Sequence, residues 1–249
     1  MSASQNTQTQ NTPTKRVSVW SGPRNVSTAL MYAFRSRSDT MVVDEPLYGH
    51  YLELTRAPHP GFDEVIVHLE TDPERAVRDT LLGRYTKPVV MFKNMAHHLV
   101  GLERGFLSEL ENILLVRDPA EMLPSLAAHL LEPTLRDTGL QEQTELLAFI
   151  LASGKTPVVL EARRLLENPE RVLRGLCDAL ALPFKPAMLS WAEGPKPEDG
   201  VWAKYWYGNV HASRGFTPYV PKTEPFPDAL KPLLEVCTPL YEKLRVYTL

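Results

Sequence analysis

The densest group of side chains that could do chemistry lies in residues 20–28, which read WSGPRNVST. An apolar run ends there in a glycine-containing turn, and Ser27 and Thr28 then open a segment with helical spacing. A helix N-terminus offers unpaired N–H groups and the positive end of a dipole, and the two hydroxyls add further donors. Arg24 supplies a full positive charge in a planar fork that suits anionic oxygens. The stretch predicts an anion-binding loop, although each residue taken singly also fits a helix cap or a plain surface position.

This loop is not a Walker A loop, which places Gly-Lys-Ser/Thr after a four-residue gap from its first glycine. Counting from Gly22, that place is held by Ser27 and Thr28, and the second glycine and the lysine are both missing. The phosphates of ATP with Mg²⁺ are therefore not the best match for the loop.

A second candidate anion site follows the apolar run Ile113–Val116. The run ends in Arg117-Asp118-Pro119, and Ser125 lies eight residues after Arg117. In Mg²⁺-dependent P-loop enzymes a strand end of this kind often carries an acidic metal ligand, but here an arginine comes first. A cation at the carboxyl edge of a parallel sheet, with a hydroxyl two turns along the next helix, can hold a second phosphate.

Together these stretches resemble the sulfotransferase family whose donor is 3′-phosphoadenosine 5′-phosphosulfate (PAPS). The family's 5′-phosphosulfate loop has the form Pro-Arg/Lys-Ser-Gly-Thr/Ser-Thr, and residues 23–28 match it at both ends, with Asn25-Val26 in place of Ser-Gly. Its 3′-phosphate motif is an Arg at a strand end, then Asn/Asp-Pro, then a Ser eight residues after the Arg, and residues 117–125 fit it in full. Residues 158–184 also look like the family's late strand and helix, so the likeness spans about residues 16–185.

The resemblance implies a set of donor-binding residues. Those for the 5′-phosphosulfate are Arg24, Asn25, Ser27 and Thr28, and those for the 3′-phosphate are Arg117 and Ser125. Arg214-Gly215 is similar to a late Arg-Gly segment that many members bring over the 3′-phosphate. Because the loop lacks its usual glycine, its backbone could wrap the phosphosulfate less closely, and the earlier Gly22 is a candidate to take over that role.

The resemblance also implies catalytic residues. Sulfuryl transfer is an in-line displacement in which placed cations and N–H donors suffice without a metal, while the acceptor hydroxyl needs a general base. Glu45 follows the second apolar run, about twenty residues after Arg24, where branches of the family carry a glutamate base, and Asp44 beside it would support it. Lys93 resembles the family lysine that steadies the bridging oxygen and the sulfuryl group, a task that Arg24 shares. Alternatively, Asp44 or Glu45 caps the following segment or pairs with Arg24, and Lys93 is a solvated lysine at the end of a strand.

Histidines and late aromatic residues are further candidates for the acceptor pocket. The cytosolic branch has a histidine base two residues after the lysine, but Met95 stands there, so that His97 and His98 are the weaker alternatives to Glu45. Either histidine could instead line the pocket or be an ordinary core or surface residue. The rings of Trp202, Trp206 and Tyr207 fit stacking on adenine, a wall of the acceptor pocket or a plain anchor to the core.

A parallel sheet must bring these residues together. Five short apolar runs, each followed by polar residues and a helical stretch, predict buried parallel strands: Val17–Trp20, Met41–Val43, Val89–Phe92, Ile113–Val116 and Val158–Leu160. Periodicity and first-turn prolines predict four helices: Val26–Ser36, Pro119–Leu131, Pro169–Leu182 and Ala229–Leu244. The proline-rich stretch Pro183–Pro227 is predicted as an extended cover. The expected fold is a three-layer α/β domain over residues 15–249, with about five parallel strands and a nucleotide-binding site of the P-loop type.

Composition narrows the choice of partners. The 249 residues are 43% hydrophobic and 23% charged, which suits one α/β domain, and the net charge of −3 provides no basic field for nucleic acid. No apolar run approaches the roughly 20 residues of a membrane helix. Residues 1–14 lack the apolar core of a signal peptide and predict a disordered polar tail. Cys177 and Cys237 lack metal spacing and are predicted to be buried thiols of a cytoplasmic protein, with a disulfide as the alternative.

The resulting hypothesis is a metal-independent sulfotransferase that moves a sulfuryl group from PAPS to a hydroxyl of a small-molecule acceptor. One alternative is a nucleotide kinase or NTPase with Asp44 as a Mg²⁺ ligand, which the missing Walker lysine opposes. The other is a nucleotide-binding protein that has lost catalysis, which the Asn25-Val26 departure keeps open. Candidate segments for acceptor specificity are Leu47–Asp63 and Pro183–Pro227, whose aromatics suggest an apolar or carbohydrate-bearing small molecule. Neither the identity of the acceptor nor the oligomeric state follows from the sequence.

Overall fold

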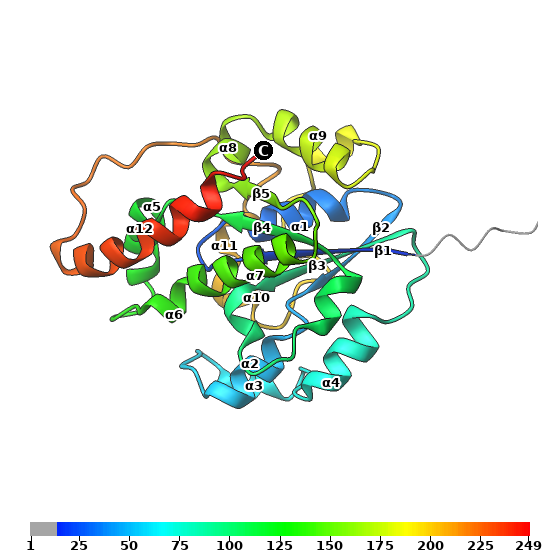
Figure 1. The fold of residues 1–249 in the computed structure, drawn as a ribbon, viewed down its shortest axis with the longest axis horizontal. Coiled ribbons are helices and arrows are strands. Elements are labelled where there is room, and N and C mark those ends of the chain that lie inside the picture. Colours follow the sequence, from blue (N-terminus) through cyan, green and yellow to red (C-terminus); the bar gives the residue numbers. More distant parts are fainter. Residues whose placement is uncertain (1–13) are drawn as a thin grey trace, which may run out of the picture.

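A sheet of five parallel strands, in the order β2-β3-β1-β4-β5, forms the centre of the chain (Figure 1). The computed structural model describes residues 14–249, so that the predicted polar tail, except for Thr14, lies outside the described residues. All five predicted strands are present and each is longer than predicted: β1 (Lys15–Ser21), β2 (Thr40–Asp44), β3 (Val89–Met95), β4 (Glu111–Val116) and β5 (Val158–Glu161). The longer β3 places Lys93 inside the strand, opposite Asp44 of β2 in the parallel register.

Two buried apolar clusters, one on each face of the sheet, make the three layers. In β1 the side chain of Trp20 belongs to one cluster and that of Val19 to the other, as expected when strand residues alternate between faces. The Val19 face is covered by α1 (Ser27–Arg35), α8 (Ala162–Glu167) and α9 (Pro169–Ala179). The Trp20 face is covered by α5 (Pro119–Ala127), α7 (Leu140–Ala152) and α12 (Lys231–Arg245). The predicted three-layer α/β fold is confirmed.

The predicted helices exist, but their ends differ from the prediction. Helix α5 ends at Ala127 rather than Leu131, whose side chain is 93% exposed and thus gives a longer helix nothing to bury. Helix α9 ends at Ala179 because Ala181 has a left-handed backbone (φ 50°) and Leu182 precedes a proline. Helix α12 begins at Lys231, after a short 3-10 turn over Asp228–Leu230.

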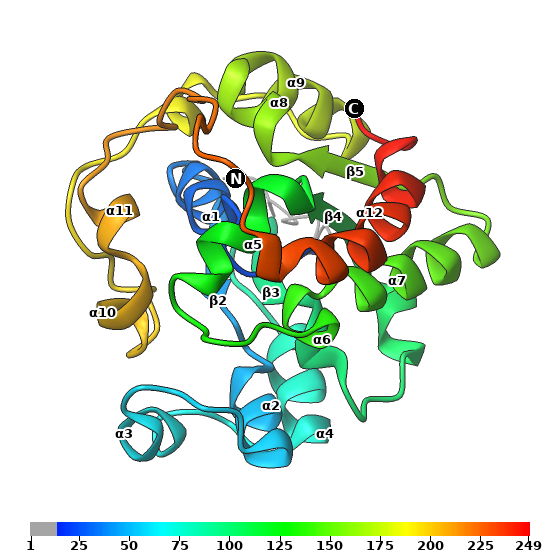
Figure 2. The ribbon, with the colours of Figure 1, turned by 90° about the vertical axis from the view of Figure 1, so that its left-hand side faces the viewer.

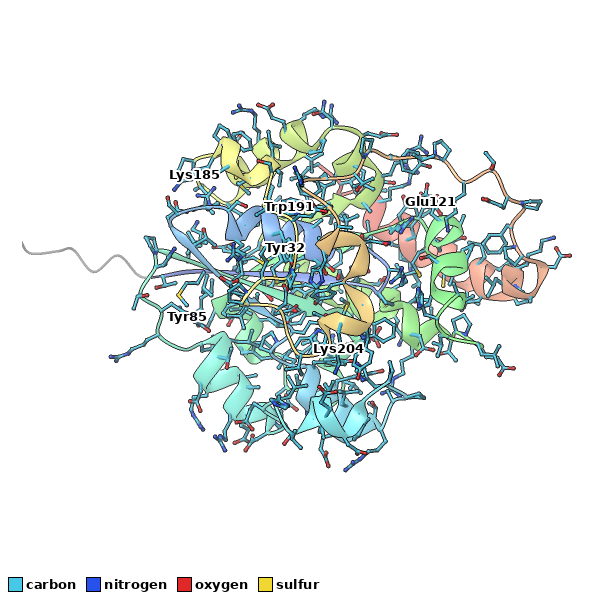
Figure 3. The ribbon with its side chains drawn as sticks, turned by 180° about the vertical axis from the view of Figure 1, so that it is seen from behind. Tyr32, Tyr85, Glu121, Lys185, Trp191 and Lys204 are labelled. Atoms are coloured by element: carbon cyan, nitrogen blue, oxygen red, sulfur yellow. The ribbon has the colours of Figure 1, made fainter. Side chains whose placement is uncertain are left out.

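Short helices connect the strands and the longer helices. They include α2 (Tyr48–Thr55), α3 (Phe62–Ile66), α4 (Pro73–Arg75), α6 (Leu135–Thr138), α10 (Ala203–Trp206) and α11 (Gly208–His211). The stretch predicted as an extended cover contains α10 and α11, and Figure 2 shows it running outside α1 and down toward α3. Lys204 of this stretch, labelled in Figure 3, pairs with Glu64 of α3 at 2.6 Å. The remaining single-turn helices are 3-10 or π segments at Ala76–Leu81, Ala96–Leu99, Gly105–Glu109 and Pro186–Leu189.

Two other expectations concern thiols and membranes. Cys177 and Cys237 are free and buried, as predicted. Among residues 14–249, no helix combines the length and the apolar character needed to cross a membrane.

A buried glutamine on α7 ties together the strands that carry the anion loop. The side chain of Gln143 is 1% exposed, and its Nε2 donates to the carbonyl oxygens of Trp20 and Leu115, each at 2.9 Å. Leucine at this position would leave both carbonyls with one donor fewer. We expect Gln143→Leu to lower the free energy of unfolding by about 1–3 kcal/mol, the usual cost of a buried polar group left unsatisfied.

Chemical denaturation would measure this effect, with Gln141→Leu as the matched control. Gln141 lies on the same helix but is exposed, and bonds only to Glu145 at 3.3 Å. Equal stability of Gln143→Leu and Gln141→Leu would contradict the bracing role of Gln143.

Candidate active site at the carboxyl edge of the sheet

A cavity of about 950 Å³ opens where β1, β2, β3 and β4 end. It is lined by nearly all of the predicted site residues, which come from four separate stretches of the chain: Arg24, Asn25, Ser27, Thr28, Glu45, Lys93, Arg117 and Ser125. His97, His98, Trp202, Trp206 and Tyr207 line it too. The structure therefore brings the two predicted anion sites and the predicted catalytic residues to one cavity.

The two predicted anion sites are physically joined. Arg24 has a left-handed backbone (φ 55°), and the Nη1 of Arg117 donates to its carbonyl oxygen at 2.7 Å. The Nε of Arg24 in turn donates to the Oγ of Ser125 at 3.2 Å. Burial and the nearby charge of Arg117 lower the pKa of Arg24 from its usual value. Two guanidinium groups so placed repel each other, so that an anion bound between them would be stabilised by both.

The start of α1 is open to a ligand. Val26 occupies the N-cap position, and no side chain caps the helix. Ser27 and Thr28 therefore do not serve as caps, and both line the cavity. Ser27 is buried and Thr28 half-buried, so that the free N–H groups of this first turn face a partly desolvated space.

Asn25 braces the loop from within. Its Oδ1 accepts from the N–H of Val26 at 2.9 Å, and its Nδ2 donates to the carbonyl oxygen of Leu115 in β4 at 2.9 Å. One loop N–H is thereby occupied by protein, and the loop is fixed to the sheet without the usual glycine. Gly22 is needed for another reason, since a Cβ there would lie 2.3 Å from the carbonyl oxygen of Thr138. Its lack of a side chain serves close packing against α6.

A buried ammonium group sits between two carboxylates at the ends of β2 and β3. The Nζ of Lys93 donates to Asp44 Oδ1 at 2.9 Å, to Glu45 Oε1 and to the hydroxyl of Tyr207 at 2.6 Å. The hydroxyl of Tyr207 donates to Asp44, whose Oδ2 lies 2.7 Å away. Glu45, Lys93 and Tyr207 line the cavity, and Asp44 does not contribute to its lining.

Burial controls the protonation of this group. Burial raises the pKa of Glu45 above its usual range; the positive charge of Lys93 acts against this rise, and the nearby Asp44 adds to it. Burial alone would lower the pKa of Lys93, but the carboxylates of Asp44 and Glu45 raise it. Glu45 also has a left-handed backbone (φ 45°), held by the bond from its N–H to the carbonyl oxygen of Lys93 at 2.8 Å. Such strain in a non-glycine residue costs about 1–3 kcal/mol and is typical of functional sites.

Aromatic rings form the wall of the cavity beyond Glu45. The ring of His98 stacks on Tyr48 and Tyr51 with centroid distances of 4.8 Å each, and His97 meets Tyr51 edge-on at 4.8 Å. Burial lowers the pKa of His97 to about 4 and that of His98 well below its usual value, so both imidazoles are neutral near pH 7. A neutral imidazole whose pKa is this low is a weak base, which favours Glu45 over either histidine as the general base.

The histidine burial predicts acid-sensitive stability. In the unfolded chain His98 takes up a proton near its ordinary pKa of 6.5, whereas in the folded chain it does not, so that stability falls as the pH falls below that value. His98→Phe keeps a ring between Tyr48 and Tyr51. Between pH 7 and pH 5 we expect the free energy of unfolding to fall by about 2 kcal/mol less in this variant than in wild type. Denaturation at both pH values would test this, with the exposed His68→Gln as control. Equal acid sensitivity of wild type and His98→Phe would contradict it.

The segment after residue 213 docks beside the anion site. Glu121, labelled in Figure 3, contacts Arg117 at 3.6 Å and accepts from the hydroxyl of Tyr219 at 2.6 Å. The Nζ of Lys222 donates to the carbonyl oxygen of Glu121 at 3.0 Å. Arg214 does not contribute to the cavity lining; its side chain is 81% exposed and pairs with Glu193 at 2.8 Å, although Ser213 and Gly215 line the cavity. The assignment of Arg214 to the donor thus stays a prediction.

The sequence does not predict the link between Tyr207 and Lys93. It allows Tyr207 as a ring that stacks on adenine, forms a wall of the acceptor pocket or anchors the chain to the core, and the structure places it in the cavity lining. Tyr48 and Tyr51 lie in the stretch Leu47–Asp63, whose aromatics are candidates for acceptor specificity, but no motif singles out either ring. These residues lie in short helices or irregular chain, where no periodic pattern indicates which face is inward. For Tyr207 the sequence carries only the signal of a polar aromatic residue in a late, irregular stretch, whereas Tyr48 and Tyr51 follow Glu45 closely in the chain.

Comparison with known proteins places this geometry in context. Residues 15–247 match a protein family described as "Sulfotransferase domain". Two Arabidopsis thaliana proteins, Branched-chain-amino-acid aminotransferase-like proteins 1 and 2, are 42% identical over 230 residues and 38% identical over 233 residues. The matches cover 91% and 93% of this chain but 41% of each relative, so that the chain spans less than half their length.

Solved structures share the fold at low sequence identity. The sulfotransferase domain of the Synechococcus PCC 7002 olefin synthase aligns with a TM-score of 0.56 at 15% identity, covering 91% of this chain and 95% of that one. A sulfotransferase from Alicyclobacillus acidocaldarius aligns with a TM-score of 0.55 at 14% identity, covering 93% and 94%. The sulfotransferase domain of the curacin biosynthetic pathway aligns with a TM-score of 0.51 at 17% identity, covering 90% and 98%.

Proposed function

The chain belongs to the sulfotransferase domain family, and from this premise we propose that it transfers the sulfuryl group of PAPS to a hydroxyl of a small-molecule acceptor. The observation that carries the proposal is the convergence of Arg24, Arg117 and Ser125 on the cavity that also holds Glu45 and Lys93. Two joined cationic sites suit a donor with two separate anionic groups, the 5′-phosphosulfate and the 3′-phosphate. In this proposal Arg24, Asn25, Ser27 and Thr28 surround the former, and Arg117 and Ser125 bind the latter.

The reaction then follows from the placement of the groups. Glu45 accepts the proton of the acceptor hydroxyl, whose oxygen forms a bond to sulfur as the bond between sulfur and the bridging oxygen breaks. The electron pair of the broken bond stays on the 5′-phosphate of adenosine 3′,5′-bisphosphate. Lys93 and Arg24 stabilise the charge that develops on the bridging and sulfuryl oxygens. Placed cations suffice for a group that carries fewer negative charges than a phosphoryl group, and we propose that no metal takes part.

The environment of Asp44 opposes the alternative of a Mg²⁺-dependent kinase or NTPase. Its carboxylate accepts from Lys93 at 2.9 Å, from Tyr207 at 2.7 Å and from the N–H of Gly200 at 3.2 Å. A carboxylate whose oxygens already bind an ammonium group and two further donors is poorly disposed to coordinate Mg²⁺. This supports a transfer mechanism based on the lysine.

The electrostatics of the cavity favour an acceptor without negative charge. Beyond the anion site, Glu45 and Asp137 bring carboxylates to the lining, and the Lys93 ammonium has its three N–H groups engaged by Asp44, Glu45 and Tyr207. Most of the remaining wall is apolar, made of aromatic rings, aliphatic side chains and the neutral His97 and His98. We therefore propose an uncharged hydroxyl compound with an apolar face as the acceptor.

Transfer of radiolabelled sulfuryl groups tests both the activity and this preference. With PAPS as donor and no added metal, we expect kcat/KM for benzyl alcohol to exceed that for 4-(hydroxymethyl)benzoate about tenfold, because the added carboxylate meets like charges a few Å away. Absence of sulfated product from PAPS, together with phosphorylated product from ATP and Mg²⁺, would contradict the proposed activity. Equal rates with the two alcohols would contradict the preference alone.

A further inference from the structure

The Lys93 ammonium is saturated in this structure. It has three N–H groups, and Asp44, Glu45 and the Tyr207 hydroxyl take one each. The side chains of Lys93 and Asp44 are each 1% exposed and that of Glu45 is 7% exposed. Since Lys93 has no spare N–H group, it can bind an oxygen of PAPS only if one of its three partners moves away.

The three partners are not equally firmly held. Asp44 ends β2 directly opposite Lys93 in the register, and Glu45 is fixed by the bond from its N–H to the Lys93 carbonyl oxygen at 2.8 Å. Both carry a negative charge that pairs with the ammonium. Tyr207 is neutral and lies between the two short helices α10 and α11 of the stretch that runs outside α1 (Figure 2). A bond from an ammonium to a neutral oxygen is weaker than one to a carboxylate, so that Tyr207 is the partner most easily lost.

Losing this bond would not leave the Tyr207 hydroxyl without partners. Its proton is donated to Asp44, with Oδ1 at 2.9 Å and Oδ2 at 2.7 Å, and the Nε1 of Trp202 lies 3.4 Å from its oxygen. Only the N–H of Lys93 would be exchanged. The oxygen that replaces Tyr207 must come from the cavity, which Lys93 and Tyr207 both line.

We propose that Tyr207 is the exchangeable partner of Lys93: its hydroxyl holds the ammonium before PAPS binds and yields its place to a sulfuryl oxygen when PAPS binds. This makes Tyr207 a positioning residue that acts through Lys93, and it rests on the proposed function. Tyr207 and the sulfuryl group then compete for one N–H of Lys93. Adenosine 3′,5′-bisphosphate, which has no sulfuryl group, does not enter this competition.

Calorimetric titration of Tyr207→Phe with PAPS and with adenosine 3′,5′-bisphosphate, without acceptor, tests the exchange. Phenylalanine keeps the ring that packs under the ammonium at 4.9 Å but removes the competing oxygen. We expect PAPS to bind about two- to tenfold more tightly than to wild type, the effect of about one hydrogen bond, and the bisphosphate to bind with unchanged affinity. Tyr205→Phe is the matched control, since Tyr205 lies in the same stretch with its hydroxyl toward Glu64 at 3.4 Å.

Each other outcome has a distinct meaning. If both nucleotides bind more weakly to Tyr207→Phe, Tyr207 only supports the fold of the site, and the exchange is wrong. If PAPS alone binds more weakly or with unchanged affinity, Tyr207 does not compete with the sulfuryl group, and the exchange is again wrong. If wild type itself binds neither nucleotide, the donor assignment under the proposed function fails first, and the exchange fails with it.

Discussion

Replacing Glu45 with glutamine is expected to lower kcat for sulfuryl transfer by about 10²- to 10⁴-fold, the usual contribution of a positioned general base. Glutamine keeps the size of the side chain and an oxygen for Lys93, but it cannot accept the acceptor's proton. Because burial raises the pKa of Glu45, the wild-type kcat should fall as the pH falls through a value above the ordinary pKa of 4.5. That acidic limb should be absent from the residual activity of Glu45→Gln. Steady-state kinetics across this pH range would measure both effects.

Donor binding provides the control for this variant. Glu45 makes no hydrogen bond or ion pair with Arg24 or Arg117. The affinity of Glu45→Gln for adenosine 3′,5′-bisphosphate should therefore differ from that of wild type by less than about twofold, as is usual for residues that do not contact each other. Glu53→Gln, at an exposed position of α2, should retain wild-type kcat. Full activity in Glu45→Gln together with its loss in His97→Gln or His98→Gln would show that a histidine is the base.

Replacing Arg117 with alanine is expected to weaken PAPS binding by about 10- to 150-fold, the loss of one or more charge-assisted hydrogen bonds. Arg117 contributes to PAPS binding in two ways. At the end of β4 the guanidinium group contacts Arg24, whose own side chain donates to Ser125, and the 3′-phosphate is proposed to bind there. The guanidinium group also holds the left-handed conformation of Arg24 by donating to its carbonyl oxygen at 2.7 Å. Calorimetric titration with PAPS would measure the loss.

A second ligand separates these two parts. Adenosine 5′-phosphosulfate, which lacks the 3′-phosphate, should bind Arg117→Ala and wild type with affinities that differ much less than those for PAPS. The exposed Arg171→Ala on α9 should bind both donors as wild type does. If Arg117→Ala lost the same fraction of its affinity for both donors, Arg117 would act only on the loop conformation. The assignment of the 3′-phosphate to Arg117 would then be wrong.

The sheet and the meeting of Arg24, Arg117 and Ser125 at its carboxyl edge were predictable because local sequence determines them. Buried parallel strands are short apolar runs, and the carboxyl ends of such strands meet at one edge whatever lies between them. The spacing from Arg117 to Ser125 spans a strand end and two helical turns, so that both side chains were expected near the loop of Arg24, and the bond from Arg24 to Ser125 at 3.2 Å agrees with this. The substitution of the loop glycine was also visible, although its compensation by Asn25 was not.

Other features depend on contacts that local sequence does not specify. Lys93 is part of a hydrogen-bond network that was not predicted. Tyr207, 114 residues away in the chain, accepts from Lys93 and donates to Asp44. The bracing by Gln143 likewise joins α7 to strands far away in the sequence. Arg214 had a matching neighbour glycine, but its side chain pairs with Glu193 at the surface. A two-residue match in irregular chain does not determine which way a side chain points.

The assignment of PAPS as the donor can be tested by a calorimetric comparison of three nucleotides that bind to the wild-type protein. Adenosine 3′,5′-bisphosphate should bind at least about tenfold more tightly than 5′-AMP, because one charge-assisted pair to a 3′-phosphate contributes about that factor. It should also bind more tightly than ATP with Mg²⁺. Equal affinity for the bisphosphate and 5′-AMP, or tightest binding of ATP with Mg²⁺, would contradict the assignment of PAPS as the donor.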